Sequence, residues 1–326
     1  MEVGIAYDLR SGLARDDGPD DRLEEFDAAD TVEAVAAALE ACGYHVRPLG
    51  GGRALLRELF DRPPDLVFNM AEGDGTRSRE AHVPAACELL GIPYTHSDPL
   101  TLAATLDKAV AKQLVAAAGV ATPRWQVVHG AGEEIALEFP VIAKPVAEGS
   151  SKGLRLSSRC DATDELQAHL VRLLRDYRQP VLVEEFCPGP ELTVGIVGTG
   201  AAAAPVGVME IVPRQVPLDR FVYSVEVKRL SEDAVEYRSP PDLPAALLAQ
   251  VEEAALAAYR ALGCRDVARV DFRLDAAGEP RFLEVNPLPG LQPGWGDVVL
   301  LAERRGIGYD ELIGTIVRLA RERQGL

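Results

Sequence analysis

Residues 264–290, CRDVARVDFRLDAAGEPRFLEVNPLPG, constrain the fold more than any other stretch of the chain. Polar and apolar residues alternate with a period of two on both sides of a turn segment, residues 276–279, as they do in a half-buried β-hairpin. If this four-residue loop closes the hairpin symmetrically, Asp271 lies directly opposite Glu284 on one face. Two opposed carboxylates repel each other unless a cation lies between them.

Two kinds of cation would satisfy this pair of acids. The simpler one is a salt bridge from Arg269 or Arg273, which lie on the same strand. The other is a divalent metal ion, because the same register adds the amide oxygen of Asn286 to the two carboxylates. Such a hard oxygen set suits Mg²⁺ or Mn²⁺. Arg269 would then lie one pleat from the ion, where it could stabilise a developing oxyanion.

Composition limits the class of protein. The 326 residues are enough for two or three domains, and the net charge of -17 argues against nucleic acid or an anionic membrane surface as partner. The five cysteines are scattered without a CxxC pair, which predicts buried free thiols in a reducing compartment. No basic leader and no run of about 18 apolar residues is present. We therefore expect a cytoplasmic protein.

The first hundred residues alternate between strands and helices, which predicts an open, doubly wound α/β sheet. The expected strands are residues 3–7, 45–49 and 65–69. Asp30 or Thr31 is expected to cap the first helix. The polar segment 10–29, with Glu24 and Glu25, lies beyond a strand's carboxyl end, where such sheets bind ligands. Taken alone, these two acids are better explained as a solvated approach to the helix.

The middle of the chain contains a candidate phosphate-binding loop. A strand ending in Lys144 leads into residues 148–153, EGSSKG, which offer two hydroxyls, flexible backbone N–H groups and a lysine. The spacing excludes a Walker A motif. A helix at about 100–118 bears Lys108 and Lys112, which would ordinarily be solvated.

The remaining chain is expected to alternate between strands and helices around one mobile segment. The expected helices are residues 164–175, 244–262 and 309–323. The expected strands include one ending in Glu184, one opening with Glu191, and others near 203–211 and 222–228. The proline-bearing segment 213–220 between the last two is a candidate lid.

Taken together, these motifs resemble the ATP-grasp superfamily, and most closely the D-alanine–D-alanine ligases. The resemblance rests on four segments in order, YTHSDPLTLAATLDKAVAKQ, KPVAEGSSKG, VLVEEF with Glu191, and VDFRLDAAGEPRFLEVNPLPG, and covers nearly the whole chain. It implies an ATP-grasp fold that is α/β at the N-terminus and α+β in the C-terminal half. It also implies an N-terminal substrate domain at 1–99, a central subdomain at 100–187 and a C-terminal subdomain at 188–326.

The resemblance also implies residue roles, including ATP and two Mg²⁺ ions as ligands. The nucleotide would be bound by Lys108, Lys144 and Lys228 at the phosphates, by Glu184 and the backbone of Phe186 and Cys187 at the adenine, and by Glu191 at the ribose. The metal ligands would be Asp271, Glu284 and Asn286. The groups around the reacting substrates would be Ser150, Ser151, Arg269 and the Gly290 backbone N–H. The glutamate that holds the first substrate falls near Glu24, with Glu25 as the alternative.

The substrate half departs from the family pattern in three places. Arg229 stands where the family has a tyrosine, Trp295 and Gly296 stand where a serine would bind the second substrate's carboxylate, and the loop before Glu24 lacks the usual signature. We therefore predict an ATP-dependent carboxylate–amine ligase of specialised metabolism that joins an amino acid to a bulkier or cyclic partner, as mycosporine-type members do.

Three other functions compete with this prediction. They are a genuine D-alanine–D-alanine ligase of cell-wall synthesis, a non-catalytic ATP-binding regulator, and a phosphotransferase that stops at a phosphorylated product. Only a ligase would require both a carboxylate and an amine to release ADP and phosphate. In each case the expected partners are small molecules, and a homodimer is the expected assembly.

Overall fold

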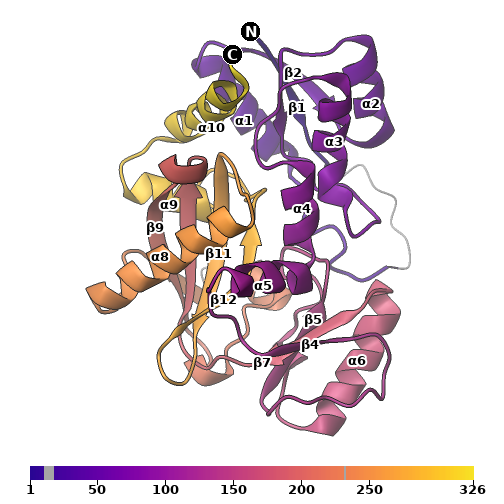
Figure 1. Ribbon diagram of the computed structural model, residues 1–326, viewed down its shortest axis with the longest axis vertical. Coiled ribbons are helices and arrows are strands. Elements are labelled where there is room, and N and C mark those ends of the chain that lie inside the picture. Colours follow the sequence, from indigo (N-terminus) through magenta and orange to yellow (C-terminus); the bar gives the residue numbers. More distant parts are fainter. Residues whose placement is uncertain (11–17, 231–232) are drawn as a thin grey trace.

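The computed structural model describes residues 1–10, 18–230 and 233–326, which build three sheets with helices packed on them (Figure 1). The N-terminal sheet is parallel, with strand order β2-β1-β3. Its strands are β1 (Glu2–Ala6), β2 (His45–Gly50) and β3 (Leu66–Asn69). One face packs on α1 (Ala29–Ala41) and the other on α2 (Gly52–Asp61) and α3 (His82–Leu90). The predicted doubly wound sheet is therefore confirmed.

The strand order of this sheet reverses at β1, so a crevice opens beyond the carboxyl ends of β1 and β3. The helix that follows β1 starts earlier than expected, because its N-cap is Ala28 and makes no side-chain hydrogen bond. Asp30 and Thr31 lie inside the first turn, so the capping prediction was wrong. Part of the predicted polar segment, residues 11–17, lies outside the described residues.

The single helix predicted at 100–118 is two helices, α4 (Pro99–Leu106) and α5 (Lys108–Ala117). Asp107 separates them, since its extended backbone ends α4 while its side chain accepts hydrogen bonds from the N–H groups of Ala109 and Val110, both at 3.1 Å. Lys108 and Lys112 on α5 are both buried, so they are not the solvated lysines expected from a surface helix.

The central sheet is antiparallel, with order β4-β7-β5-β6. Its strands are β4 (Trp125–Val128), β5 (Val141–Pro145), β6 (Arg159–Cys160) and β7 (Val181–Glu185), and α6 (Thr163–Tyr177) packs on it. The candidate phosphate loop connects β5 to β6.

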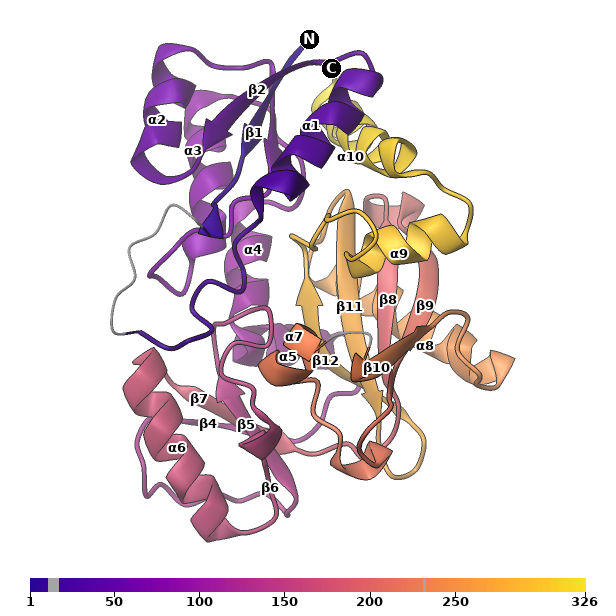
Figure 2. The ribbon, with the colours of Figure 1, turned by 180° about the vertical axis from the view of Figure 1, so that it is seen from behind.

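The C-terminal sheet is also antiparallel, with order β10-β9-β8-β11-β12 (Figure 2). Its strands are β8 (Glu191–Val197), β9 (Ala204–Pro213), β10 (Val235–Arg238), β11 (Val267–Leu274) and β12 (Pro280–Asn286). One face packs on α8 (Ala245–Ala261) and the other on α9 (Asp297–Arg304). The last helix, α10 (Tyr309–Gln324), returns to the N-terminal region and packs on α1.

The strand predicted at 222–228 is wrong, because this segment forms the short helix α7 (Val225–Leu230). Its alternating valines matched a strand pattern, but Ser224 starts a helical turn by accepting a hydrogen bond from the Val227 N–H at 3.4 Å. Val227 packs against Phe221 and Ile211 on β9. Tertiary packing therefore overrides the local preference for a strand.

All five cysteines are free thiols, and four of them are buried as predicted. Cys42 is exposed, because it lies just beyond the end of α1, where its thiol approaches the carbonyl oxygen of Asp310 at 3.5 Å. None of the helices in the described parts of the chain is long and apolar enough to cross a membrane.

Candidate active site

The β11–β12 hairpin places its two carboxylates as predicted, with Asp271 opposite Glu284 and Arg269 opposite Asn286. The predicted loop was one residue too short, because Leu274 pairs with Pro280. A register shift between Asp271 and the next residue of β11 offsets the longer loop. The two irregularities cancel at the acidic pair, so the face that bears the acids is the predicted one.

Arginine and lysine side chains hold the two acids in different charge environments. Asp271 Oδ2 lies 2.9 Å from Arg269 Nη2, and its Oδ1 accepts a hydrogen bond from the Thr193 hydroxyl at 2.9 Å. Glu284 Oε2 lies 3.2 Å from Lys108 Nζ. Burial raises the pKa of Asp271 despite Arg269. Burial opposes ionisation of Glu284 too, but Lys108 and other nearby cations outweigh it and lower the pKa of Glu284 to about 2.

The predicted salt bridge to Asp271 thus exists, and Arg269 makes it. Arg269 also pairs with Asp297 on α9, at 2.8 Å between Nη1 and Oδ2. Arg273 turns away, to Glu191 at 3.6 Å and to backbone carbonyl groups. Within the described residues, no three or more His, Cys, Asp or Glu side chains gather as a metal site. A metal ion here would need the amide oxygen of Asn286 as its third protein donor.

A buried pair of lysines surrounds Glu184, the candidate adenine ligand at the end of β7. Lys144 Nζ lies 2.6 Å from its Oε1, and Lys112 Nζ lies 2.8 Å from its Oε2. Burial pushes the pKa of Glu184 upward, but the two lysines together hold it below its usual value. The position of Lys112 was missed, although Lys112 follows Lys108 by four residues and so lies on the same helix face.

The candidate nucleotide residues, Lys108 excepted, line one small cavity. Its walls include Lys144, Ser151, Glu184, Phe186, Cys187, Glu191, Lys228, Asp271 and Glu284. The guanidinium group of Arg273 stacks over the Phe186 ring, with 4.4 Å between the Arg273 Cζ and the ring centroid. Tyr223 also lines this cavity, and Lys228 Nζ lies 5.1 Å from the centroid of its ring. The volume is about 70 Å³, smaller than a ligand-sized pocket, so the walls must separate to admit a nucleotide.

The candidate phosphate-binding loop, residues 148–153, is called the serine loop from here on, and Glu25 ties it to the N-terminal domain. Both oxygens of Glu25 accept hydrogen bonds from Arg79 Nη2, at 2.8 and 2.9 Å, and Lys152 Nζ lies 2.6 Å from Oε2. The backbone N–H of Gly149 also donates to Glu25. Burial would raise the pKa of Glu25, but Lys152 and Arg79 outweigh it and lower that pKa.

Glu24 has a different partner, although it is next in sequence. Arg229 on α7 approaches its Oε1 at 2.8 Å through Nη2 and at 2.9 Å through Nε. This ion pair is partly exposed to solvent. Ser150 and Glu24 line a common cavity, which is described below. Ser151 donates a hydrogen bond to the Tyr223 carbonyl oxygen at 2.9 Å. Both serines have left-handed backbones, with φ of 48° and 59°.

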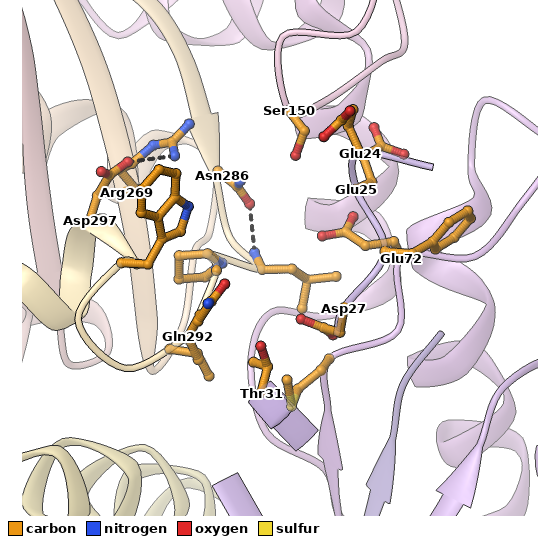
Figure 3. A pocket seen from close by; sticks show the side chains of 18 of the residues that line it. Glu24, Glu25, Asp27, Thr31, Glu72, Ser150, Arg269, Asn286, Gln292 and Asp297 are labelled. Carbon is orange, nitrogen blue, oxygen red and sulfur yellow. Dashed lines mark hydrogen bonds and ion pairs between the residues drawn. The ribbon is translucent and has the colours of Figure 1, made fainter. Parts of the chain in front are cut away.

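A second cavity, of about 470 Å³, lies between the hairpin and the N-terminal domain. Figure 3 shows Arg269, Asn286 and Asp297 on one side, and Glu24, Glu25, Glu72 and Ser150 on the other. Gly290 and Trp295, which is 43% exposed, belong to the hairpin side. Gly296 is required beside them, since a Cβ there would lie 2.1 Å from the Gly290 carbonyl oxygen.

Several residues of this cavity were not predicted as site residues, among them three acids and an asparagine. Asn69 ends β3, Glu72 follows that strand by three residues, Asp27 precedes α1, and Asp297 begins α9. Local patterns carry no signal for them, because the sheet crossover and the return of the C-terminal chain bring them together.

Comparison with known proteins agrees with this architecture. The family described as "D-ala D-ala ligase C-terminus" matches residues 114–318. The chain is 34% identical to the D-alanine–D-alanine ligase of Aquifex aeolicus, over 88% of this chain and 93% of that one. It is 35% identical to the uncharacterized protein y4sG of Sinorhizobium fredii, over 90% and 88% of the two chains.

Two solved structures share the fold at a TM-score of 0.76 and 22% identity. One is the Bacillus anthracis D-alanine–D-alanine ligase complexed with ATP, aligned over 100% of this chain and 99% of that one. The other is the VanG D-Ala:D-Ser ligase of Enterococcus faecalis, aligned over 98% and 99%. Fold and relatives together define an ATP-dependent carbon–nitrogen ligase of the ATP-grasp class. Within that class, the chain belongs to the D-alanine–D-alanine ligase family.

Proposed function

We propose that this protein joins a carboxylate substrate to an amine through an acyl phosphate, and that the product is a compound of specialised metabolism rather than D-alanyl-D-alanine. The residues of the large cavity that would contact the substrates support the second part of this proposal, that the product is not D-alanyl-D-alanine. There Arg229 neutralises Glu24, and Trp295 occupies the position where a carboxylate-binding serine is expected.

ATP is the proposed co-substrate, held in the small cavity. Lys108, Lys144 and Lys228 would bind the phosphates, and the burial of Lys108 and Lys144 strengthens their electrostatic attraction to an anion. Glu184 and the backbone of Phe186 and Cys187 would bind the adenine, and Glu191 the ribose. Because Glu184 already forms ion pairs with two lysines, nucleotide entry would redistribute these charged contacts.

The hairpin donors fit Mg²⁺ or Mn²⁺. Asp271, Glu284 and Asn286 offer oxygen atoms from paired positions on adjacent strands, and Glu284 stays ionised at neutral pH. Asn286 Oδ1 accepts from the Leu288 N–H at 3.1 Å, which holds this amide oxygen in place. A metal ion bound by these donors would neutralise phosphate charge and act as a Lewis acid.

The proposed reaction has two displacements. A carboxylate oxygen attacks the γ-phosphorus and ADP leaves; the amine nitrogen then attacks the acyl carbon, loses a proton, and inorganic phosphate leaves. Arg269 and Gly290 both line the large cavity, and the Arg269 guanidinium and the Gly290 N–H would stabilise the tetrahedral oxyanion. Ser150 and Ser151 would close over the reacting groups, so that water does not hydrolyse the acyl phosphate.

The substrate half disfavours a second D-alanine. Loss of a hydroxyl that binds a carboxylate costs about 1.5 to 3 kcal/mol, or about a ten- to hundredfold loss of affinity. Trp295 instead presents a broad apolar surface that suits a bulkier partner. The D-alanine ligase function is the second candidate, since several relatives such as the Aquifex aeolicus protein have that name.

The test is a screen of ADP and phosphate release over pairs of amino acids and amino-acid-like metabolites, with D-alanine alone as one condition. We expect release that requires both a carboxylate and an amine, and little release with D-alanine alone. Efficient release of ADP and phosphate with D-alanine alone, with formation of the dipeptide, would instead indicate a D-alanine–D-alanine ligase of cell-wall synthesis. Release with one substrate alone would instead indicate a phosphotransferase.

A further inference from the structure

The acids of the large cavity have their negative charges compensated or suppressed by other groups of the protein. Among the described residues, five acids line this cavity, namely Glu24, Glu25, Asp27, Glu72 and Asp297 (Figure 3). They decide whether a substrate can carry a protonated amine into the cavity, because an ammonium group that leaves water needs an anionic partner. The contacts of these acids therefore indicate the class of substrate.

Glu25 has no acceptor site left for a ligand. Its carboxylate accepts hydrogen bonds from Arg79 Nη2 at 2.8 and 2.9 Å, from Lys152 Nζ at 2.6 Å, and from the Gly149 N–H. A carboxylate offers about four acceptor sites, so these bonds use them all. The side chain of Glu25 is also only 2% exposed. Glu25 thus binds an ammonium group that belongs to the protein itself, that of Lys152.

Two further acids are paired with arginines. Arg229 approaches Glu24 Oε1 at 2.8 Å through Nη2 and at 2.9 Å through Nε. Arg269 Nη1 lies 2.8 Å from Asp297 Oδ2. An ammonium group placed at either acid would lie beside a guanidinium group, which repels it. Neither acid is therefore a good partner for a cationic substrate.

The last two acids hold protons. The side chains of Glu72 and Glu80 form a hydrogen bond, which two carboxyl groups can do only when one of them is protonated. Burial and the charge of Glu80 raise the pKa of Glu72 well above its usual value. Burial also raises the pKa of Asp27 to about 7, although Arg10 opposes the change. Near neutral pH, neither Asp27 nor Glu72 is a fully ionised carboxylate.

From these contacts we propose that the acid activated by this enzyme carries no ammonium group beside its carboxylate, so that it is a hydroxy, keto or simple aliphatic acid rather than an amino acid. Lys152 is then a specificity-determining residue, because its own ammonium group occupies Glu25. The inference rests on the proposed function, since it names the class of acid that this function activates. An amino acid can still be the second substrate, because its nitrogen reacts as the neutral amine.

Pairs of acids of similar shape test the inference by binding, without turnover. Calorimetry would compare lactate with alanine and 3-phenyllactate with phenylalanine, in both configurations, on protein saturated with Mg²⁺ and a non-hydrolysable ATP analogue. Within each pair a hydroxyl group replaces an ammonium group. We expect the hydroxy acid to bind at least tenfold more tightly than the amino acid in at least one pair. A preference below tenfold in every pair, or no binding of any hydroxy acid, would overturn the inference.

Lys152→Met and Lys152→Gln test the cause of the preference, because each leaves Glu25 with one cation fewer. Each variant that folds should reduce the preference at least fivefold, through tighter binding of the amino acid. Arg175→Met is the control, since it removes one positive charge from an exposed arginine on α6 that pairs with Asp176. It should leave the preference unchanged. An equal effect of the Lys152 and Arg175 variants would overturn the inference.

Hydroxylamine trapping separates this inference from the proposed function. Hydroxylamine nitrogen attacks the carbonyl carbon of an acyl phosphate and phosphate leaves, so the hydroxamate formed with ATP and Mg²⁺ identifies the acid that was activated. We expect hydroxamate to form at least tenfold faster from hydroxy acids than from amino acids. Faster formation from the amino acids would overturn the inference and support the ligase mechanism. No hydroxamate from any acid of the substrate screen, with the binding preference intact, would count against the proposed function alone.

Discussion

Glu25→Gln should destabilise the protein and release the serine loop, whereas Glu24→Gln should do neither. Glu25 is 8% exposed and is the shared anion for two buried cations, Arg79 and Lys152. Removing one partner of a buried ion pair costs about 3–5 kcal/mol, because the remaining charge is uncompensated. Glu148 still approaches both cations, so we expect the lower end, about 3 kcal/mol.

Glu24→Gln is the matched control, because it makes the same chemical change at the neighbouring residue. The side chains of Glu24 and Arg229 are 27% and 41% exposed, so this pair should contribute about 0–1 kcal/mol. Chemical denaturation would measure the difference in unfolding free energy. Hydrogen exchange would report on Gly149, whose N–H donates to Glu25. We expect exchange at Gly149 to accelerate by about 100-fold in Glu25→Gln, which corresponds to about 3 kcal/mol.

The reasoning fails if the two variants are destabilised equally, or if Gly149 stays protected in Glu25→Gln. Either result would mean that Glu25 is not the anion that ties the loop to the N-terminal domain. A loss of activity in Glu24→Gln without loss of stability would be consistent with the account, since Glu24 lies on the substrate cavity wall.

Three further outcomes are expected. Asp271→Asn or Glu284→Gln should lower kcat by about 100-fold or more, because each removes a charged metal ligand. Circular dichroism should show that the fold is retained. Near-normal turnover in either variant would exclude the metal site. Saturating ATP and Mg²⁺ should slow hydrogen exchange in residues 148–153 and 213–229, and unchanged exchange would argue against a lid. Burial, with the charge of Asp8 and despite Arg10, raises the pKa of Asp27 to about 7. Between pH 4 and 7 the unfolded chain therefore binds fewer protons than the folded one, and stability falls as pH rises through this window. Asp27→Asn should remove this loss, gaining up to about 4 kcal/mol at pH 8 and nothing near pH 4 in denaturation experiments; a pH-independent difference would contradict the shift.

The sequence predicted the arrangement of site residues correctly where these residues lie on adjacent strands of one hairpin. The period-two pattern predicted that Asp271 and Glu284 lie opposite each other, and the bulge and longer loop cancelled without moving them. Helical periodicity likewise located the long helices, because their apolar stripes pack on the sheets. The segment at 222–228 failed because packing of Val227 decided its conformation.

The substrate side could not be predicted, since it depends on contacts between distant parts of the chain. Nothing local separates Glu24 from Glu25, yet one pairs with Arg229 and the other with Arg79 and Lys152. Asn69 shows its unsatisfied donor only once the surrounding backbone is known. Such features arise from contacts between elements that are far apart in the sequence.

The most direct test of the central claim is transfer of a heavy oxygen isotope from the carboxylate substrate to phosphate. The carboxylate identified in the ADP-release screen would be labelled in both oxygens and turned over with its amine partner, ATP and Mg²⁺. A reaction through an acyl phosphate predicts one labelled oxygen in each inorganic phosphate released and one in each amide product. Phosphate without label, formed at the same rate as ADP, would show that ATP is hydrolysed by water and would contradict the proposed ligase mechanism.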